Sequence, residues 1–294
     1  MQIGGHTKVF GIIGDPVAHS MSPLFQNRFA DLHGIDAVYV PFHVRPDDVV
    51  TALEGMRAIE VVGFNVTVPH KEAVLEMVEA DLAAQTIGAV NTVWRDRGGW
   101  RATNTDWHGV MDVLQGLGAR LTGTEVLMFG AGGTARAVLH AMAESRVQRL
   151  RICNRNRERL ERLTAHAARH YPNLVVEAVA WDRAEVEAAS EGASLLVNTT
   201  SIGLGEVPGT FPFELHGHGL AMDAVYRPDG KTPFVTAACH GGRRAVDGLP
   251  MLVAQGAASF RFWHGEKPDW HEALHWLEER LGRGHHAIAR EHAA

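Results

Sequence analysis

The sequence predicts an α/β protein: a first part with a mostly parallel sheet, followed by a doubly wound, Rossmann-type domain. Three observations predict this class. Strand-like and helix-like stretches alternate from residue 8 onward, as βαβ units require. A second such series begins near Gly109. A glycine cluster at residues 130–133 stands directly between a strand-like and a helix-like stretch, where a dinucleotide-binding turn belongs.

Composition bounds the possibilities. The chain has 294 residues, and because domains average about 100–200 residues we expect about two of them. Hydrophobic residues make up 46% and charged residues 21%, which excludes a mainly disordered chain. The net charge of −6 argues against a nucleic-acid partner, since affinity for phosphate backbones comes from Lys and Arg. With 2 cysteines and no long apolar stretch, we expect a cytoplasmic protein without a membrane partner.

In the first part, short β-branched stretches predict strands at residues 8–14, 37–44 and 61–66. Helices are predicted at residues 23–33, 46–58 and from 70 to about 86. The first of these helices has Pro23 in its first turn and Ser22 as a possible N-cap. Residues 89–95 and 100–103 predict a hairpin that turns at Gly98-Gly99.

In the second part, apolar stretches predict strands at residues 125–129, 149–153, 195–198 and 222–225. An alanine-rich helix is expected at residues 134–143, and helical patterns return from 249 and at 270–281. This alternation of strands and helices is typical of a doubly wound nucleotide-binding domain.

The glycine turn predicts a dinucleotide site. Glycines let the backbone turn tightly and approach a pyrophosphate, which the free N–H groups of the following helix bind. The pattern is G-x-G-G-x-x-x-A, with Ala135 where the fingerprint G-x-G-x-x-G has its third glycine. The alternative interpretation is a tight surface turn without a ligand.

The residues after the next strand indicate which dinucleotide binds. An NAD site places Asp or Glu there to hold the ribose hydroxyls, whereas this chain has Asn-Arg-Asn-Arg-Glu-Arg at 154–159. Arginines can clamp a ribose 2′-phosphate through charge-assisted, bidentate bonds. The sequence therefore predicts NADP, and the alternative is a basic helix start exposed to solvent.

A possible zinc motif lies near the end of the chain. Residues 271–275 read H-E-A-L-H, and two histidines four residues apart on a helix can bind zinc. However, Trp270, Leu274 and Leu277 form an apolar stripe typical of a helix that packs on a core. Glu278 also stands where the longer metalloprotease motif has glycine. We therefore expect no metal.

Several segments together form a recognisable series. They are His19–Pro23 (HSMSP), Asn65–Lys71 (NVTVPHK), Gly88–Thr92 (GAVNT), Asn104–Asp106 (NTD), the glycine turn with Asn154-Arg155, Asn198–Ser201 (NTTS), Asp223–Tyr226 (DAVY) and Gly248–Gln255 (GLPMLVAQ). In this order and spacing the series resembles the shikimate dehydrogenase family, over about residues 8–270.

The resemblance implies a reversible, NADPH-dependent reduction of 3-dehydroshikimate to shikimate, a step toward aromatic amino acids. It also implies a substrate-binding, catalytic domain at 1–107 with 248–294, whose C-terminal helices return to the first domain. An NADP-binding Rossmann domain would then occupy residues 108–247. We expect a small-molecule substrate and a monomer or homodimer.

The resemblance makes Lys71 the catalytic residue and pairs it with Asp106. Carbonyl reduction places negative charge on an oxygen, so a proton donor must stand within hydrogen-bond reach, and a lysine can serve. Taken alone, Lys71 would be typical of a solvated helix start, and Asp106 of a helix N-cap.

The remaining roles follow the resemblance position by position. Substrate contacts are assigned to Ser20, Ser22, Thr67, Asn91, Tyr226 and Gln255. Cofactor contacts are assigned to Gly130, Ala131, Gly132, Gly133 and Thr134 for the pyrophosphate, to Asn154, Arg155, Asn156 and Arg159 for the adenosine phosphate, and to Thr199, Ala224 and Gly248 near the nicotinamide. Taken singly, most of these residues would more often be turn or cap residues.

The resemblance leaves the choice among shikimate, quinate and aminoshikimate open. Ser22 is typical of shikimate-using members, since a threonine there is more typical of quinate users. Pro250, the longer turn at 227–230 and Thr134 depart from common family patterns. A quinate or aminoshikimate dehydrogenase, which could use NAD, is therefore an alternative. A ligand sensor without turnover is a second one, disfavoured by the presence of both Lys71 and Asp106.

Overall fold

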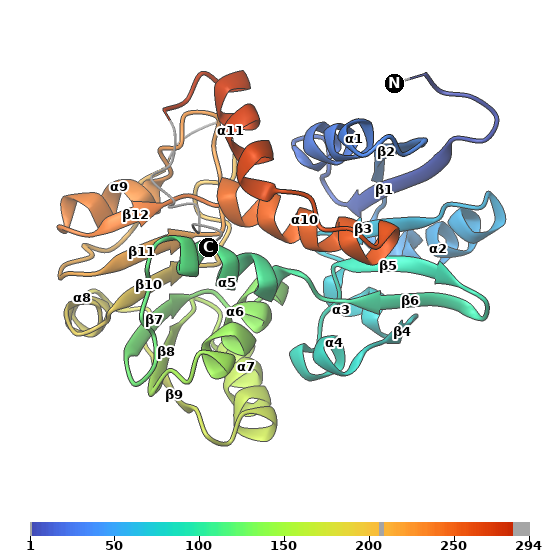
Figure 1. Cartoon of the computed structure of the whole chain (residues 1–294). Coiled ribbons are helices and arrows are strands. Elements are labelled where there is room, and N and C mark those ends of the chain that lie inside the picture. Colours follow the sequence, from blue (N-terminus) through green and yellow to red (C-terminus); the bar gives the residue numbers. More distant parts are fainter. Residues whose placement is uncertain (1, 206–208, 285–294) are drawn as a thin grey trace. The chain divides into compact units, whose positions relative to one another are not determined.

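The computed structural model describes residues 2–205 and 209–284. Within them the chain divides into two compact units, each with its own sheet (Figure 1). The first unit runs to Gly109 and includes Leu252–Leu277; the second comprises Val110–Met251 and the described residues from Glu278 onward. Arg283 Nη2 bonds Asp247 Oδ1 at 3.0 Å, which ties the chain beyond 278 to the second unit. Residues 285–294, assigned to the substrate domain above, lie outside the described residues.

The first unit is built on a six-stranded mixed sheet in the order β2-β1-β3-β5-β6-β4. Its strands are β1 (Lys8–Gly14), β2 (Ala37–His43), β3 (Gly63–Val66), β4 (Glu79–Ala80), β5 (Thr92–Asp96) and β6 (Gly99–Thr103). Strands β2, β1 and β3 are parallel, whereas β5 runs antiparallel to both β3 and β6. The predicted hairpin is confirmed as the β5–β6 pair, but its turn residues are Arg97 and Gly98, because Gly99 already pairs with Asp96.

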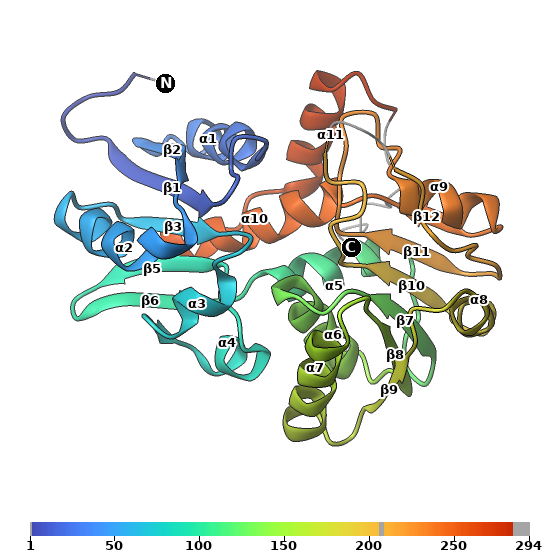
Figure 2. The same cartoon turned by 180° about the vertical axis from the view of Figure 1, so that it is seen from behind.

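Helices cover both faces of this sheet (Figure 2). The helical segments of this unit are α1 (Ser22–Leu32), the 3₁₀ turn η1 (Pro46–Asp48), α2 (Val49–Ala58), α3 (Lys71–Leu75), α4 (Leu82–Ile87), the first residues of α5 (Asp106–Gly116), and most of α10 (Leu249–His264) and α11 (Trp270–Arg280), of which α11 contacts α1 through Arg28. On one face α2 packs Leu53 into a core with Phe64 and Trp100. On the other, Phe29 contacts Phe25 and Phe260 edge to face, with ring centroids 5.7 and 5.6 Å apart.

The continuous helix expected from residue 70 to about 86 is wrong. The structure ends α3 at Leu75, inserts the short strand β4 and begins α4 at Leu82. Residues Glu79 and Ala80 pair with β6, so the sheet edge takes these backbone groups away from a helix. Asp81 then caps α4, because its carboxylate accepts the N–H of Ala84 at 2.8 Å.

The second unit is a doubly wound domain, as predicted. Its six parallel strands lie in the order β12-β11-β10-β7-β8-β9, which is the Rossmann order 3-2-1-4-5-6 read from the other edge. They are β7 (Glu125–Phe129), β8 (Arg149–Cys153), β9 (Val175–Val179), β10 (Leu195–Asn198), β11 (Leu220–Asp223) and β12 (Arg244–Val246). The predicted bounds of β7, β8 and β10 are confirmed, because buried parallel strands read as continuous apolar runs.

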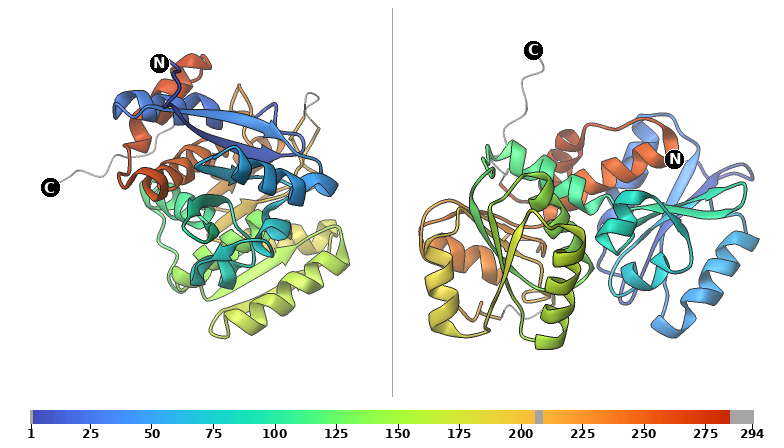
Figure 3. Two further views of the ribbon diagram at one scale, coloured as in Figure 1. Left: turned by 90° about the vertical axis from the view of Figure 1, so that its right-hand side faces the viewer. Right: turned by 90° about the horizontal axis from the view of Figure 1, so that it is seen from below.

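Helices lie on both faces of this second sheet (Figure 3). They are α6 (Gly133–Glu144), α7 (Arg157–His170), α8 (Arg183–Glu191) and α9 (Pro233–His240). Helices α8 and α9 contribute Val186 and Phe234 to a core that also holds Phe129 and Phe211. The rings of Phe129 and Phe211 meet edge to face with centroids 5.2 Å apart.

Candidate active site

Strand direction gathers the predicted substrate residues at one edge of the first sheet. Strands β1, β3 and β6 end there, and antiparallel β5 begins there. Ser20 follows β1, Thr67 follows β3, and Asp106 follows β6, whereas Asn91 stands just before β5. The carboxyl ends of parallel strands are where α/β sheets bind ligands. Sequence segments far apart therefore meet at this edge.

A buried ion pair lies at this edge. Lys71 is the first residue of α3, and its Nζ donates to Asp106 Oδ2 at 2.5 Å. The two side chains are only 11% and 6% exposed, so each charge is balanced mainly by the other. An ammonium group has three N–H donors, and this bond uses one of them. The pair can therefore offer further donors to an oxygen of a bound molecule.

Asn91 holds the other oxygen of Asp106. The backbone N–H of Thr105 donates to Asn91 Oδ1 at 2.7 Å, which fixes the orientation of the amide. The Nδ2 group of Asn91 therefore faces Asp106 Oδ1 at 2.8 Å and Gln255 Oε1 at 3.1 Å. Asp106 also lies in the first turn of α5, where the helix dipole stabilises a carboxylate. The structure thus brings together four predicted residues: Lys71, Asn91, Asp106 and Gln255.

Sequence reasoning missed the residues that support Asn91 from behind. Tyr39 Oη donates to Asn65 Oδ1 at 2.8 Å, and Asn65 Nδ2 donates to Asn91 O and to Ser259 Oγ, both at 2.9 Å. Burial raises the pKa of Tyr39 well above its usual value, so its hydroxyl stays a donor. Asn65 lies in a motif quoted above, whereas Tyr39 and Ser259 carry no local signal.

The two predicted serines lie on the loop after β1 and at the start of α1. Ser22 is 2% exposed, and its side chain lies close to the hydroxyl of Tyr39. Met21, not Ser22, occupies the N-cap position, so the plain helix-cap interpretation of Ser22 is wrong. Ser20 Oγ accepts the N–H of Ser22 at 3.3 Å. Thr67 is half-buried, and its N–H donates to Ile13 O at 2.9 Å.

In the second unit the glycine turn links β7 to α6. Gly130 has a φ of 111°, and a Cβ there would lie 2.3 Å from Thr199 Oγ1, so only glycine fits. A Cβ at Gly132 would meet no atom within 4 Å in the described part of the chain. Packing thus leaves open space at Gly132, and a phosphate at the N-terminus of α6 would need that space. The turn residues Gly130, Ala131, Gly132, Gly133 and Thr134 fit a pyrophosphate.

The basic segment after β8 separates into paired and unpaired arginines. Asn156 caps α7 by accepting the N–H of Arg159 at 2.9 Å. Arg157 donates to Glu161 at 2.8 Å. Within residues 2–205 and 209–284, Arg155 and Arg159 form no ion pair with a carboxylate. These two exposed guanidinium groups are therefore the ones able to bind a phosphate. Asn154 Nδ2 donates to Asn156 O at 2.7 Å, which tightens the same turn.

The residues predicted near the nicotinamide lie at the carboxyl edge of the second sheet. Thr199 Oγ1 donates to Phe129 O at 2.8 Å, and Ala224 N donates to Asn198 O at 2.8 Å. A Cβ at Gly248 would lie 2.3 Å from Ala224 O, so packing alone explains that glycine. Tyr226, predicted to contact substrate, follows Ala224 on the loop after β11.

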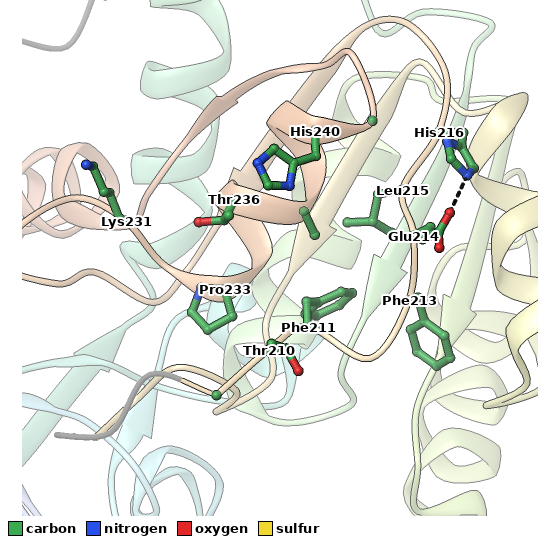
Figure 4. A pocket seen from close by; sticks show the side chains of 13 residues that line it. Thr210, Phe211, Phe213, Glu214, Leu215, His216, Lys231, Pro233, Thr236 and His240 are labelled. Carbon is green, nitrogen blue, oxygen red and sulfur yellow. Dashed lines mark hydrogen bonds and ion pairs between the residues drawn. The ribbon is translucent and has the colours of Figure 1, made fainter.

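A separate cavity of about 510 Å³ lies in the second unit between residues 209–216 and α9 (Figure 4). Phe211, Leu215 and Thr236 line it, and Glu214 at its rim bonds His216 at 3.1 Å. None of the predicted site residues lines this cavity.

No group of three or more His, Cys, Asp or Glu residues is placed to hold a metal ion in the described ranges. On α11, Trp270, Leu274 and Leu277 of the predicted apolar stripe are buried, while His275 is exposed. A search of the same residues finds no helix with the length and apolar character that a membrane span needs.

One unit has a Rossmann sheet with a glycine turn and the other holds a buried lysine–carboxylate pair, a combination typical of dinucleotide-dependent oxidoreductases. Family models agree: residues 12–93 match the shikimate dehydrogenase substrate binding domain, 113–186 match shikimate / quinate 5-dehydrogenase, and 248–269 match the shikimate 5′-dehydrogenase C-terminal domain. The chain belongs to the shikimate dehydrogenase family.

Individual relatives match over nearly the full length. The chain is 39% identical to shikimate dehydrogenase (NADP(+)) of Geobacter metallireducens over 272 residues, which cover 91% of this chain and 95% of the relative. The crystal structure of shikimate dehydrogenase from Aquifex aeolicus superposes with a TM-score of 0.82 at 34% identity, covering 96% and 100% of the two chains. That of Thermus thermophilus shikimate 5-dehydrogenase in complex with NADP(H) and shikimate gives 0.80 at 34% identity, covering 93% and 99%.

Proposed function

We propose that this chain catalyses the reversible, NADPH-dependent reduction of 3-dehydroshikimate to shikimate, with Lys71 as general acid and base and Asp106 as its partner. The names of the relatives and the NADP(H)–shikimate complex of one of them support this substrate and cofactor. The observation that carries the proposal is the buried Lys71–Asp106 pair, held in place by Asn91.

The chemistry assigned to the pair follows from its geometry. NADPH supplies the hydride when bound. Lys71 Nζ donates a proton to the carbonyl oxygen, on which negative charge develops during reduction. In the oxidation direction the same nitrogen accepts the proton of the hydroxyl. Asp106 keeps Lys71 in place and accepts a hydrogen bond from a substrate hydroxyl with its remaining lone pairs.

The other polar residues of the first unit suit a carboxylated polyol. The hydroxyls of Ser20 and Ser22 would bind the carboxylate, and Thr67, Asn91 and Gln255 the ring hydroxyls. Tyr226 of the second unit is assigned a further substrate contact. A site built to bond hydroxyls rejects analogues that lack them, because its own polar groups are then left unpaired.

In this proposal, each unit binds mainly one of the two ligands, substrate or NADP. The first unit is the substrate-binding, catalytic domain and the second is the NADP-binding domain. The open space at Gly132 and the unpaired Arg155 and Arg159 support a phosphate-bearing dinucleotide in the second unit. Arginines in place of an acidic residue favour NADP over NAD.

A matrix of substrates and cofactors tests the proposal. Absorbance of the reduced nicotinamide is followed while the purified protein meets shikimate, quinate or aminoshikimate with NADP⁺ or NAD⁺. We expect the highest kcat/KM for shikimate with NADP⁺. A preference for quinate or aminoshikimate would instead establish one of the paralogous dehydrogenases. Binding of shikimate in calorimetry without turnover of any pair would establish a sensor.

A further inference from the structure

Two neighbouring strands of the second sheet end in the same kind of turn. Strand β10 ends at Asn198 and β11 at Asp223, and the two residues are directly paired across the parallel ladder. Asn198 Oδ1 accepts the N–H of Thr200 at 3.1 Å, and Asp223 Oδ1 accepts the N–H of Val225 at 3.0 Å. Each is an Asx turn, in which a side chain bonds the backbone two residues on.

The two turns are joined by their own side chains. Because Thr200 N–H can only donate, Asn198 Oδ1 must face it, and Asn198 Nδ2 then donates to Asp223 Oδ1 at 2.8 Å. Both residues are fully buried, so neither bond competes with water. Asp223 Oδ2 accepts the hydroxyl of Thr232, the N-cap of α9, at 2.6 Å. The carboxylate of Asp223 therefore bonds the loop after β10, the loop after β11 and the start of α9.

The residues at the centres of these turns are Thr199 and Ala224, which are those assigned to the nicotinamide end of the cofactor. Thr199 is also the residue whose side chain and backbone confine Gly130 in the glycine turn. A shift of the turn after β10 would therefore displace both Thr199 and the glycine turn at Gly130. The reaction proposed above gives neither Asn198 nor Asp223 a role.

We propose that Asn198 and Asp223 are positioning residues: their mutual hydrogen bond holds Thr199 and Ala224 in the arrangement that receives the nicotinamide half of the cofactor. This inference rests on the proposed function. It requires that breaking the bond impair use of the intact dinucleotide while leaving recognition of its adenosine half unchanged.

Two variants that each change one charge, Asn198→Asp and Asp223→Asn, test the hydrogen bond between these residues. Burial, together with the nearby Asp247 carboxylate, raises the pKa of Asp223 to about 7, and Asp247 is itself ion-paired with Arg283 at 3.0 Å. Asn198→Asp keeps the acceptor for Thr200 but turns a carboxylate oxygen toward Asp223. Asp223→Asn keeps an acceptor for Asn198 and Val225 but turns its NH2 group toward the Thr232 hydroxyl, so the bond to the start of α9 is lost while the link between the two turns stays. Each variant changes one charge, but only Asn198→Asp breaks the hydrogen bond between residues 198 and 223.

The experiment measures kcat and KM for NADP⁺ with shikimate, the Kd of adenosine 2′,5′-bisphosphate, and the melting temperature. For Asn198→Asp we expect kcat/KM for NADP⁺ to fall about tenfold or more, as loss of a charged hydrogen bond allows, with the bisphosphate Kd changed less than about twofold. Asp223→Asn should lower the melting temperature through its lost bond to Thr232, but its kcat/KM for NADP⁺ should fall less than that of Asn198→Asp, because the link between the two turns is kept. Asp182→Ala, which removes an exposed N-cap of α8, is the control: it should lower the melting temperature by a few degrees but leave kcat, KM and the bisphosphate Kd unchanged.

Acidification provides a second readout. Two facing carboxyl groups share a proton at low pH, which restores one hydrogen bond. The deficit of Asn198→Asp relative to wild type should therefore be largest at alkaline pH, where both carboxyl groups are ionised, and should shrink as the pH falls. Wild-type kinetics in Asn198→Asp, or an equal loss of bisphosphate binding, would overturn the positioning role. Failure of the wild-type protein to bind the bisphosphate would instead overturn the proposed function.

Discussion

Lys71 and Asp106 lie 35 positions apart in the chain, yet their side chains bond at 2.5 Å in a setting largely removed from water. A lysine after a proline is ordinarily a solvated residue, and an aspartate at a helix start is ordinarily a cap. Here the carboxylate bonds Lys71 and Asn91. Burial and partners, rather than residue type, therefore give these side chains their chemical capacity.

Removal of the Lys71 ammonium provides a direct residue-scale test. Lys71→Met keeps much of the side-chain volume but has no proton to donate, so we expect kcat to fall about 10²–10⁴-fold. The KM for shikimate should change far less, because the lost interaction acts mainly in the transition state. Lys8→Met, at the exposed start of β1, is the control. Near-normal kcat in Lys71→Met would contradict the assigned role.

The basic segment allows a comparison of neighbouring arginines. Arg155→Ala should raise the KM for NADP⁺ about tenfold or more and leave the KM for NAD⁺ unchanged, because only NADP⁺ carries the 2′-phosphate. Arg157→Ala should affect neither value appreciably, since that guanidinium is exposed and bonds Glu161. Steady-state kinetics with both cofactors would measure this, and equal effects on NADP⁺ and NAD⁺ would remove the phosphate clamp.

At the scale of elements, one buried arginine of the second unit bonds the end of a helix and the loops before two strands. Arg243 is 3% exposed, and its guanidinium donates to the carbonyls of Ser190, Ala193, His216 and His218. These carbonyls belong to the end of α8 and to the loops before β10 and β11. Burial lowers the pKa of Arg243 from its ordinary value, but the group stays charged at neutral pH.

Arg243 is therefore expected to stabilise the second unit strongly. Arg243→Met would leave several buried carbonyls without a donor, and we expect the free energy of unfolding to fall by about 3 kcal/mol or more. The adjacent, exposed Arg244 bonds the carbonyl of Leu117, and Arg244→Met should cost less than about 1 kcal/mol. Urea unfolding followed by circular dichroism compares the two, and equal costs would show that burial is not the cause.

At the scale of the molecule, each compact unit has its own sheet, core and set of predicted ligand residues. Lys71, Asn91, Asp106 and Gln255 all belong to the first unit, whereas the glycine turn and Arg155 belong to the second. In the proposed function, the substrate contacts therefore lie in the first unit, apart from Tyr226, and most of the cofactor contacts lie in the second. Location in the cytoplasm and a monomeric or homodimeric state stay predictions of the sequence.

Hydrogen exchange tests the division of ligands between the units. Shikimate alone should slow amide exchange in the first unit, around residues 67–71 and 104–106, because binding stabilises the local structure that it contacts. Adenosine 2′,5′-bisphosphate alone should slow exchange in the second unit, around residues 130–134 and 154–159. Mass spectrometry of peptides locates both effects. Protection by shikimate confined to the second unit would contradict the assignment of the substrate domain.

The sequence by itself determined the α/β class, the Rossmann strands and the series of motifs at the strand ends. Such strands are buried on both faces, so their apolar runs are readable without any knowledge of their neighbours. The motif residues follow strand ends because those ends share one edge of a sheet. The β5–β6 hairpin was readable for a similar reason, since a tight turn is a local property.

Only the tertiary structure decided how the side chains are oriented and paired. It broke the helix expected from residue 70, because pairing with β6 outweighed local helical pattern. It placed the side chain of Asn65 against both Ser259, 194 positions away, and the backbone carbonyl of Asn91. It joined Asn198 to Asp223 across two strands. Hydrogen bonds of this kind depend on which elements become neighbours, and no local pattern of residues encodes that choice.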